Sequence, residues 1–151
     1  MKKIISFIAL LCLVFGLSSC YDKTVYHWKF EQSDNNVSKI TIVDISNNSD
    51  EETYIILKEI NIEYASALFN DIQIINMYRY YGDPLTPSGH SIIIEFSNGE
   101  YDVISQFEPT HAKYDSNGVV RNYISWLYFD SAEYEKLIIK YLSIEWFFSS
   151  S

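Results

Sequence analysis

Cysteine, glycine and basic residues are scarce in this chain. Of its 151 residues two are cysteines, Cys12 and Cys20, so residues 21–151 offer no thiol for a disulfide, a metal site or a nucleophile. The 5 glycines form no glycine-rich phosphate-binding loop. Lys and Arg number 11 against 20 Asp and Glu. This acidic balance argues against nucleic-acid binding, which depends on basic side chains that neutralise phosphates.

The longest apolar run stands at the start of the chain. Two lysines precede residues 4–17, which are almost entirely apolar, and the run closes with Leu17-Ser18-Ser19-Cys20. It is shorter than the roughly 20 apolar residues that cross a bilayer, and its flanks are typical of a cleaved signal peptide. The alternatives are an ordinary signal peptide with a chance cysteine, or a short uncleaved anchor.

Leu17-Ser18-Ser19-Cys20 resembles the lipobox of bacterial lipoproteins, with an aliphatic residue, two small residues and a cysteine. The resemblance implies that residues 1–19 are a signal peptide that is removed and that Cys20 carries the lipid. It also implies attachment to the cell membrane or outer membrane on the extracytoplasmic side. The globular part resembles small lipoproteins of no particular family, so no functional residues are transferred.

The remaining sequence predicts one domain. Residues 20–23 are expected to be the lipidated cysteine and a short tether, residues 24–148 a single domain, and residues 149–151 a tail. A hydrophobic fraction of 48% with 13 tyrosines is sufficient for one core. Removal of the two leader lysines changes the formal charge from −9 to −11.

Hydrophobic periodicity predicts an α+β fold. Period-two alternation indicates strands at residues 24–30, 37–45 and 53–58, the second with a bulge or with both faces buried. Helical spacing indicates one helix after Asn61 and another after Asp130, which with Glu133 resembles a capping box. The helix stripes are Ile62, Ala65, Leu68, Phe69, Ile72 and Ile75 in the first, and Tyr134, Leu137, Ile138, Tyr141 and Leu142 in the second.

Two Asn-Gly pairs predict hairpins, at Asn98-Gly99 and at Asn117-Gly118. A two-residue turn at Asn98-Gly99 would place Ile93 opposite Ile104 and Glu95 opposite Asp102 on the outer face. The same turn at Asn117-Gly118 would place Arg121 opposite Tyr114. We therefore expect a mostly antiparallel sheet of about six to seven strands, with two α-helices packed on one face.

Residues 78–90 are predicted to be the longest irregular stretch, and they contain Tyr78, Arg79, Tyr80 and Tyr81. Exposed aromatic loops often bind partners. The alternative is that these tyrosines cover the edge of the core. Together with the outer pair of Ile93 and Ile104, they form the candidate binding surface.

No catalytic motif, metal-ligand spacing or cofactor signature occurs in the sequence. His90 and His111 are expected at the same end of the sheet, two strands apart, and so too far apart to share a zinc ion through the sheet alone. Glu95 and Asp102 are expected to be solvated, since an open face lacks the burial that shifts a carboxyl pKa.

Three functions fit these features. The first is a lipid-anchored extracytoplasmic binding or accessory module for a protein, peptide or glycan. The second is an immunity or inhibitor protein that neutralises a basic toxin or hydrolase through its acidic surface. The third is an envelope hydrolase that uses His90 and His111.

Overall fold

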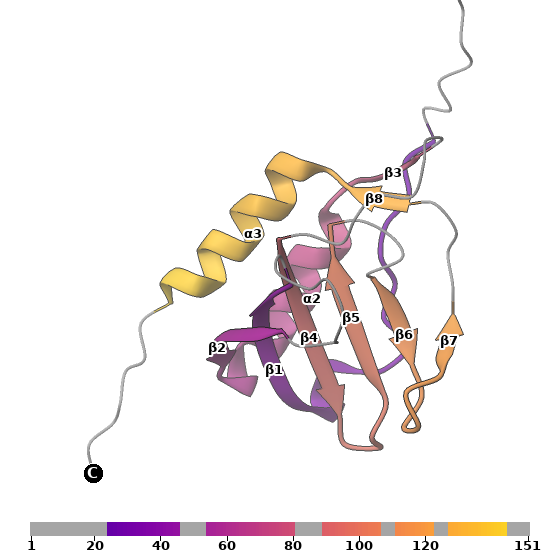
Figure 1. Cartoon of the computed structure of the whole chain (residues 1–151), viewed down its shortest axis with the longest axis vertical. Helices are drawn as coiled ribbons and strands as arrows, with labels where there is room; N and C mark the ends of the chain where they lie inside the picture. The colour runs from indigo at the N-terminus through magenta and orange to yellow at the C-terminus, as the bar shows by residue number, and fades with distance from the viewer. Residues whose placement is uncertain (1–23, 46–53, 81–88, 107–110, 123–126, 145–151) are drawn as a thin grey trace, which may run out of the picture.

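The computed structural model describes residues 24–45, 54–80, 89–106, 111–122 and 127–144. Within these ranges the chain forms two α-helices, a six-stranded antiparallel sheet and a separate two-stranded sheet, which confirms the predicted α+β class (Figure 1). No helix in the described part of the chain is long and apolar enough to span a membrane.

The large sheet has the strand order β2-β1-β4-β5-β6-β7. Its strands are β1 (Val37–Asp44), β2 (Ile55–Ile60), β4 (His90–Phe96), β5 (Tyr101–Ser105), β6 (Ala112–Tyr114) and β7 (Val120–Asn122). The small sheet pairs β3 (Met77–Arg79) with β8 (Leu127–Phe129). The β1–β2 register shifts between Ile42 and Val43 because Leu57 of β2 is an extra residue, whereas β1 pairs with β4 without a break at this point. Residues 40–43 of β1 are all buried, so of the two predicted alternatives the strand shows burial on both faces.

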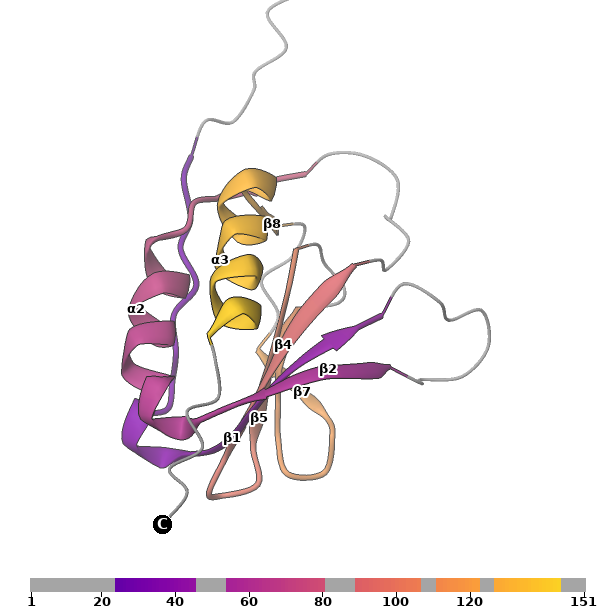
Figure 2. The same ribbon diagram turned by 90° about the vertical axis from the view of Figure 1, so that its left-hand side faces the viewer.

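The helices α2 (Ala65–Ile74) and α3 (Ser131–Ser143) both pack on one face of the large sheet (Figure 2). Asn61 caps a short 3-10 helix (Ile62–Tyr64) that leads into α2, and its side chain accepts a hydrogen bond from the Glu63 N–H. The Asp130 carboxylate caps α3 and accepts from the N–H groups of Ala132 and Glu133, each at 3.1 Å. Glu133 accepts instead from the Asn76 N–H, so the capping box does not close.

The predicted helix stripes form the core. Leu68 and Ile72 of α2 and Leu137, Ile138 and Tyr141 of α3 are almost completely buried. They pack with inward residues of the large sheet: Ile40, Ile42, Ile60, Ile92, Ile94, Phe96 and Ile104. Ile62 is the exception in the first stripe, since it is 53% exposed at the start of the 3-10 helix.

The first described segment alternates as predicted but does not join the large sheet. Trp28 is buried, Tyr26 and Phe30 are partly buried, and the residues between them are exposed. The segment forms a single bridge to the small sheet, where Tyr26 and Met77 exchange two backbone hydrogen bonds of 2.9 and 2.8 Å. The first described segment is therefore fixed next to β3 at Tyr26.

The two-residue turn expected at Asn98-Gly99 is wrong. The Phe96 N–H bonds to the Glu100 carbonyl, and Gly99 closes a three-residue loop in the left-handed region at φ 84°. The longer loop moves the register of β5 by one residue, which reverses the face of every β5 side chain.

The new register corrects both predicted pairings, Ile93 with Ile104 and Glu95 with Asp102. Ile104 lies opposite Ile92 and is completely buried in the core, so it is no part of an outer apolar pair. Ile93 lies opposite Val103. Asp102 lies opposite Ile94 on the core face, and Glu95 lies opposite Tyr101.

The Asn117-Gly118 hairpin departs from its prediction in the same way. The Asp115 N–H bonds to the Val119 carbonyl, and Gly118 has φ 78°. Tyr114 therefore pairs with Val120, and Arg121 forms ion pairs with Glu31 and Glu100 rather than facing Tyr114.

Candidate functional site

Three of the six predicted binding residues, Tyr78, Arg79 and Tyr80, lie on or beside the small sheet. Tyr78 and Arg79 belong to strand β3, which corrects the prediction that the irregular stretch begins at Tyr78. Met77, Leu127 and Phe129 are buried in the core. Because side chains alternate along a strand, Tyr78 of β3 and Tyr128 of β8 occupy the other, partly exposed face.

Three tyrosine rings gather on that face. The Tyr78 and Tyr128 ring centroids are 5.9 Å apart with planes tilted by 45°, and the Tyr80 ring stands edge-on to Tyr128 at 6.2 Å. We call Tyr78, Tyr80 and Tyr128 the tyrosine patch. Beside it, the exposed Arg79 places its guanidinium 5.6 Å from the centre of the Tyr26 ring. Such a cation–π contact holds the charged group at a defined position.

The other predicted residues do not join the tyrosine patch. Ile93 is partly exposed on the large sheet, between Thr41 and Val103. Ile104 is in the core. Tyr81 and Cys20 lie outside the described residues.

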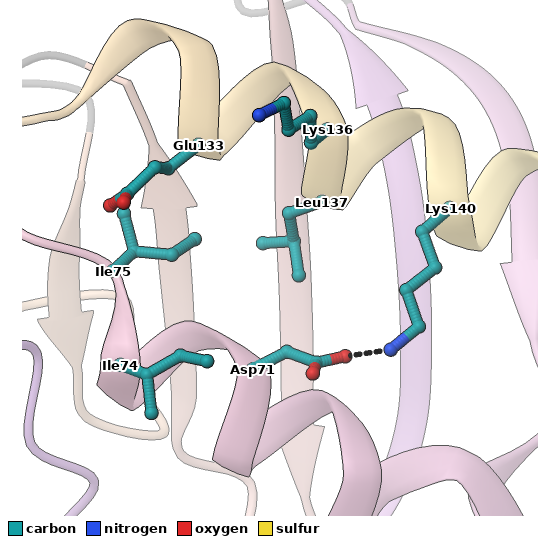
Figure 3. Close-up of a pocket in the computed structure, with 7 residues that line it drawn as sticks. All are labelled: Asp71, Ile74, Ile75, Glu133, Lys136, Leu137 and Lys140. Carbon is teal, nitrogen blue, oxygen red and sulfur yellow. Dashed lines mark hydrogen bonds and ion pairs between the residues drawn. The ribbon is translucent and has the colours of Figure 1, made fainter.

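A groove of about 320 Å³ lies between α2 and α3 (Figure 3). Its lining combines apolar and charged side chains: Asp71, Ile74, Ile75, Glu133, Lys136, Leu137 and Lys140. The Asp71 carboxylate accepts hydrogen bonds of 2.6 Å from both the Lys140 ammonium and the Tyr141 hydroxyl. Burial raises the pKa of Tyr141, and the hydrogen bond to Asp71 raises it further.

The contacts that line the groove hold α2 and α3 together. Asp71 on α2 is satisfied by two donors from α3, and Glu133 accepts a hydrogen bond from the Asn76 N–H. Most of the charge in the groove is therefore used for internal bonds, and the groove is a weaker candidate for ligand binding than the tyrosine patch.

A group of ionisable side chains lies on the core face of β5 and β6. It includes Asp102, which the sequence predicted to be solvated on the outer face. Asp102 is 6% exposed and Lys113 is 5% exposed, and the two residues are directly paired across the strands. The Lys113 ammonium bonds to the Lys29 carbonyl and to the Glu31 carboxylate, and it stands 5.6 Å from the centre of the Trp28 ring. This buried polar group attaches the first described segment to the sheet.

Burial raises the pKa of Asp102 to about 6, and the Lys113 ammonium and the Trp28 indole partly oppose that increase. Neither Asp102 Oδ2 nor Trp28 Nε1 makes a full hydrogen bond within the described structure. An incompletely satisfied carboxylate in the core has a destabilised charged form. The raised pKa of Asp102 therefore corresponds to a cost in folding stability when the carboxyl is ionised.

The two histidines have different environments. His90 is exposed at the start of β4. His111 is 3% exposed, and its ring lies 5.8 Å from the Trp28 ring and 5.7 Å from the Phe129 ring, measured between centroids. In the described ranges, no three His, Cys, Asp or Glu side chains are grouped so as to hold a metal ion.

The sequence did not reveal Tyr26 and Tyr128 as neighbours of the predicted tyrosines. The two lie far from residues 78–80 in the chain and meet them only through the bridge to β3 and the β3–β8 pairing. The apolar, aromatic stretch ending at Phe129 was the available signal, but it carries no information about its partner strand. No protein-family model, curated protein or solved structure matches this chain.

Proposed function

We propose that this protein is a lipid-anchored binding module, held in the membrane by Cys20, which presents the tyrosine patch to an extracytoplasmic protein or peptide. The observation that supports this function most directly is the tyrosine patch itself, with Arg79 beside it. Tyrosine and arginine are enriched at the centres of protein interfaces because they combine large contact area with polar groups.

The position of the tyrosine patch agrees with an anchor at Cys20. Tyr26 pairs with β3, so the chain enters the domain beside the patch (Figure 1). Five residues lie between Cys20 and Tyr26, and the six Cα-to-Cα steps that join the two positions span at most about 20 Å. The proposed anchor would thus keep the patch close to the membrane surface.

The charge of the domain favours a partner other than the bilayer. Without its leader the chain has a formal charge of −11, and anionic lipid headgroups repel an acidic domain. Repulsion would keep the tyrosine patch available to another molecule at the membrane surface.

The test is crosslinking in intact cells from a photoreactive amino acid placed at Tyr80. We expect a specific crosslinked partner, and we expect Tyr128→Ala to reduce its yield at least about tenfold because the patch loses the ring against which the side chain at position 80 packs. Tyr54→Ala is the matched control, since Tyr54 is 51% exposed and lies next to β2. Equal yields with and without Tyr128 would exclude the tyrosine patch as the binding surface.

The inhibitor alternative makes a different prediction about salt. A basic toxin attracted by the acidic surface would associate much more slowly at high ionic strength. Binding through the tyrosine patch depends mainly on ring contacts, so the association rate of the captured partner would change little. Measuring the association rate of that partner at low and high salt separates the two.

A further inference from the structure

Residues 24–32, which we call the strap, cross the molecule from the small sheet toward the start of β1. Figure 1 shows this segment running from β3 past β6 to β1. Two backbone hydrogen bonds fix Tyr26 to β3. Farther along, Trp28 is buried, and Phe30 stacks on Phe69 of α2 with ring centroids 3.7 Å apart. The strap therefore covers part of the core although it belongs neither to a helix nor to the large sheet.

One buried cation ties the strap to the large sheet. The Lys113 ammonium of β6 donates to the Lys29 carbonyl and to the Glu31 carboxylate, the latter at 3.2 Å. Arg121 of β7 pairs with the same carboxylate and is more exposed. The side chain of Lys113 is only 6% exposed, so its attraction to Glu31 is screened much less than that of a surface pair.

A second carboxylate faces the same cation. Asp102 of β5 lies directly opposite Lys113 across the strands and is also buried. Two further side chains act on Asp102, and both belong to the strap: the Trp28 indole donates toward it, and the Glu31 carboxylate repels its charge. While Asp102 is neutral, Lys113 and Glu31 form a balanced pair. Once Asp102 is ionised, two negative charges share one ammonium in the core, where repulsion is stronger than in water.

Further ionisable groups stand around this cluster. Arg121 is shared between the Glu31 and Glu100 carboxylates at the more exposed end of the strap. His111, just before β6, packs edge-on against the Trp28 ring, and the ordinary pKa of a histidine is about 6.5. On its other side, β4 places an apolar residue opposite Asp102. A pH response of the strap could therefore arise from Asp102 or from His111, and the experiment has to separate the two.

We infer that the strap is a pH-dependent tie, which opens as Asp102 ionises while the rest of the domain stays folded. Opening exposes Asp102 to water and moves Glu31 away from it, so the open state binds the proton less tightly than the closed state. The preference for the closed state is therefore greatest below about pH 4 and falls as the pH rises through about 6.

Opening of the strap would regulate the tyrosine patch, a consequence that rests on the proposed function. It would break the pairing of Tyr26 with β3 and remove the ring beside the Arg79 guanidinium. The first fixed point of the domain would move to Ser33, which caps a short 3-10 helix (Asp34–Asn36). Seven more extended residues would add up to about 23 Å between Cys20 and the domain. The patch would thus lie farther from the membrane above about pH 6.

The test is amide hydrogen exchange of the full chain in detergent micelles, followed by mass spectrometry of peptides that cover the strap. Exchange rates are divided by the intrinsic rates at each pH, so that the ratio reports opening alone. If the Asp102 pKa changes from about 6 to about 3.9 on opening, the strap opens about tenfold more often at pH 8 than at pH 5. We expect this change in the wild type and its loss in Asp102→Asn, which keeps the shape but cannot ionise.

The controls assign the response. Glu95→Gln removes a carboxylate on the exposed face of β4 and should respond to pH like the wild type. Amides of β4 should stay protected at both pH values, which shows that the domain remains folded. Loss of the response in Asp102→Asn, with β4 still protected, supports the inference.

Three results would overturn it. The first is strap protection in the wild type that does not change with pH. The second is a pH response that survives in Asp102→Asn and disappears in His111→Phe, which would assign it to the histidine. The third is equal loss of protection in the strap and in β4, which would mean that only global unfolding depends on pH. Because the measurement involves neither the lipid nor a partner, each of these failures would leave the proposed function standing.

Discussion

The alternation of apolar side chains along β5 predicts a strand correctly but places Asp102 on the wrong face of the sheet. In residues 101–105 the apolar side chains allow two phases, one with Val103 facing inward and one with Ile104 facing inward. The first phase places Asp102 in solvent and was the natural expectation. The structure adopts the second, and Asp102 is buried beside Lys113 and Trp28.

The raised pKa of Asp102 predicts a pH-dependent stability. Its pKa is about 6 in the folded protein and about 3.9 in an unfolded chain. The folded state therefore binds the proton more tightly, so the contribution of Asp102 is most favourable below about pH 4 and is lost as the pH rises through 6. Asp102→Asn removes this titration but keeps the shape.

Urea unfolding at several pH values measures the effect. Relative to the wild type, the free energy of unfolding of Asp102→Asn should increase by about 2–3 kcal/mol between pH 4 and pH 8. A constant offset is expected because the amide changes the contacts with Lys113 and Trp28. Glu95→Gln on the exposed face of β4 is the control. A difference from the wild type that is independent of pH would contradict the assigned pKa.

At the scale of the elements, the helices were predictable and the hairpin loops were not. An amphipathic helix buries one stripe of apolar side chains. The helical spacing of Leu137, Ile138 and Tyr141 therefore identifies α3 without any knowledge of the sheet against which the helix packs. A hairpin depends on loop length. Asn-Gly serves both a two-residue turn and a three-residue loop that ends in a left-handed glycine. Both loops here read Ser-Asn-Gly, and in both the glycine takes the left-handed position that ends a three-residue loop.

The two loop glycines should differ in their tolerance of alanine. Both have positive φ, which costs a non-glycine residue about 1–2 kcal/mol. A Cβ on Gly99 would also approach the Ser116 Cβ to 3.0 Å, whereas one on Gly118 would meet only the Tyr101 hydroxyl at 3.5 Å. We expect Gly99→Ala to cost about 2 kcal/mol and Gly118→Ala about 1 kcal/mol.

The midpoint and slope of urea unfolding report both values. Asparagine tolerates positive φ, so Gly118→Asn should recover part of the stability lost in Gly118→Ala. Equal losses for the two alanine variants would show that the contact with Ser116 is relieved by movement of the loops.

At the scale of the whole molecule, the candidate site depends on pairings that no local pattern reveals. Tyr78 and Tyr80 were identified from sequence because they lie in one aromatic stretch. Tyr128 follows them by about fifty residues in the chain and meets them only through the β3–β8 pairing. Strand β1 likewise lies between β2 and β4 rather than in simple sequence order. Contacts between distant segments follow from the topology of the complete core.

The proposed membrane attachment depends on Cys20, and the other cysteine, Cys12, offers a control within the same chain. We expect Cys20→Ala to remain an unprocessed precursor or to leave the membrane fraction, because the thiol that would carry the lipid is missing. Labelling with radioactive palmitate should disappear in this variant. Cys12→Ala changes the other cysteine, within the predicted leader, and should be processed and labelled like the wild type.

Comparing crosslinking with binding then tests whether location contributes to function. If the partner lies at the membrane surface, Cys20→Ala should reduce crosslinking from position 80 in cells, because the anchor no longer raises the local concentration of the tyrosine patch. The affinity of the purified domain for the same partner should be unchanged, since no residue of the patch is altered. A Cys20→Ala protein that is still cleaved, labelled and sedimented with membranes would overturn the anchor. Loss of affinity in the purified protein would instead place Cys20 or its tether in the binding surface.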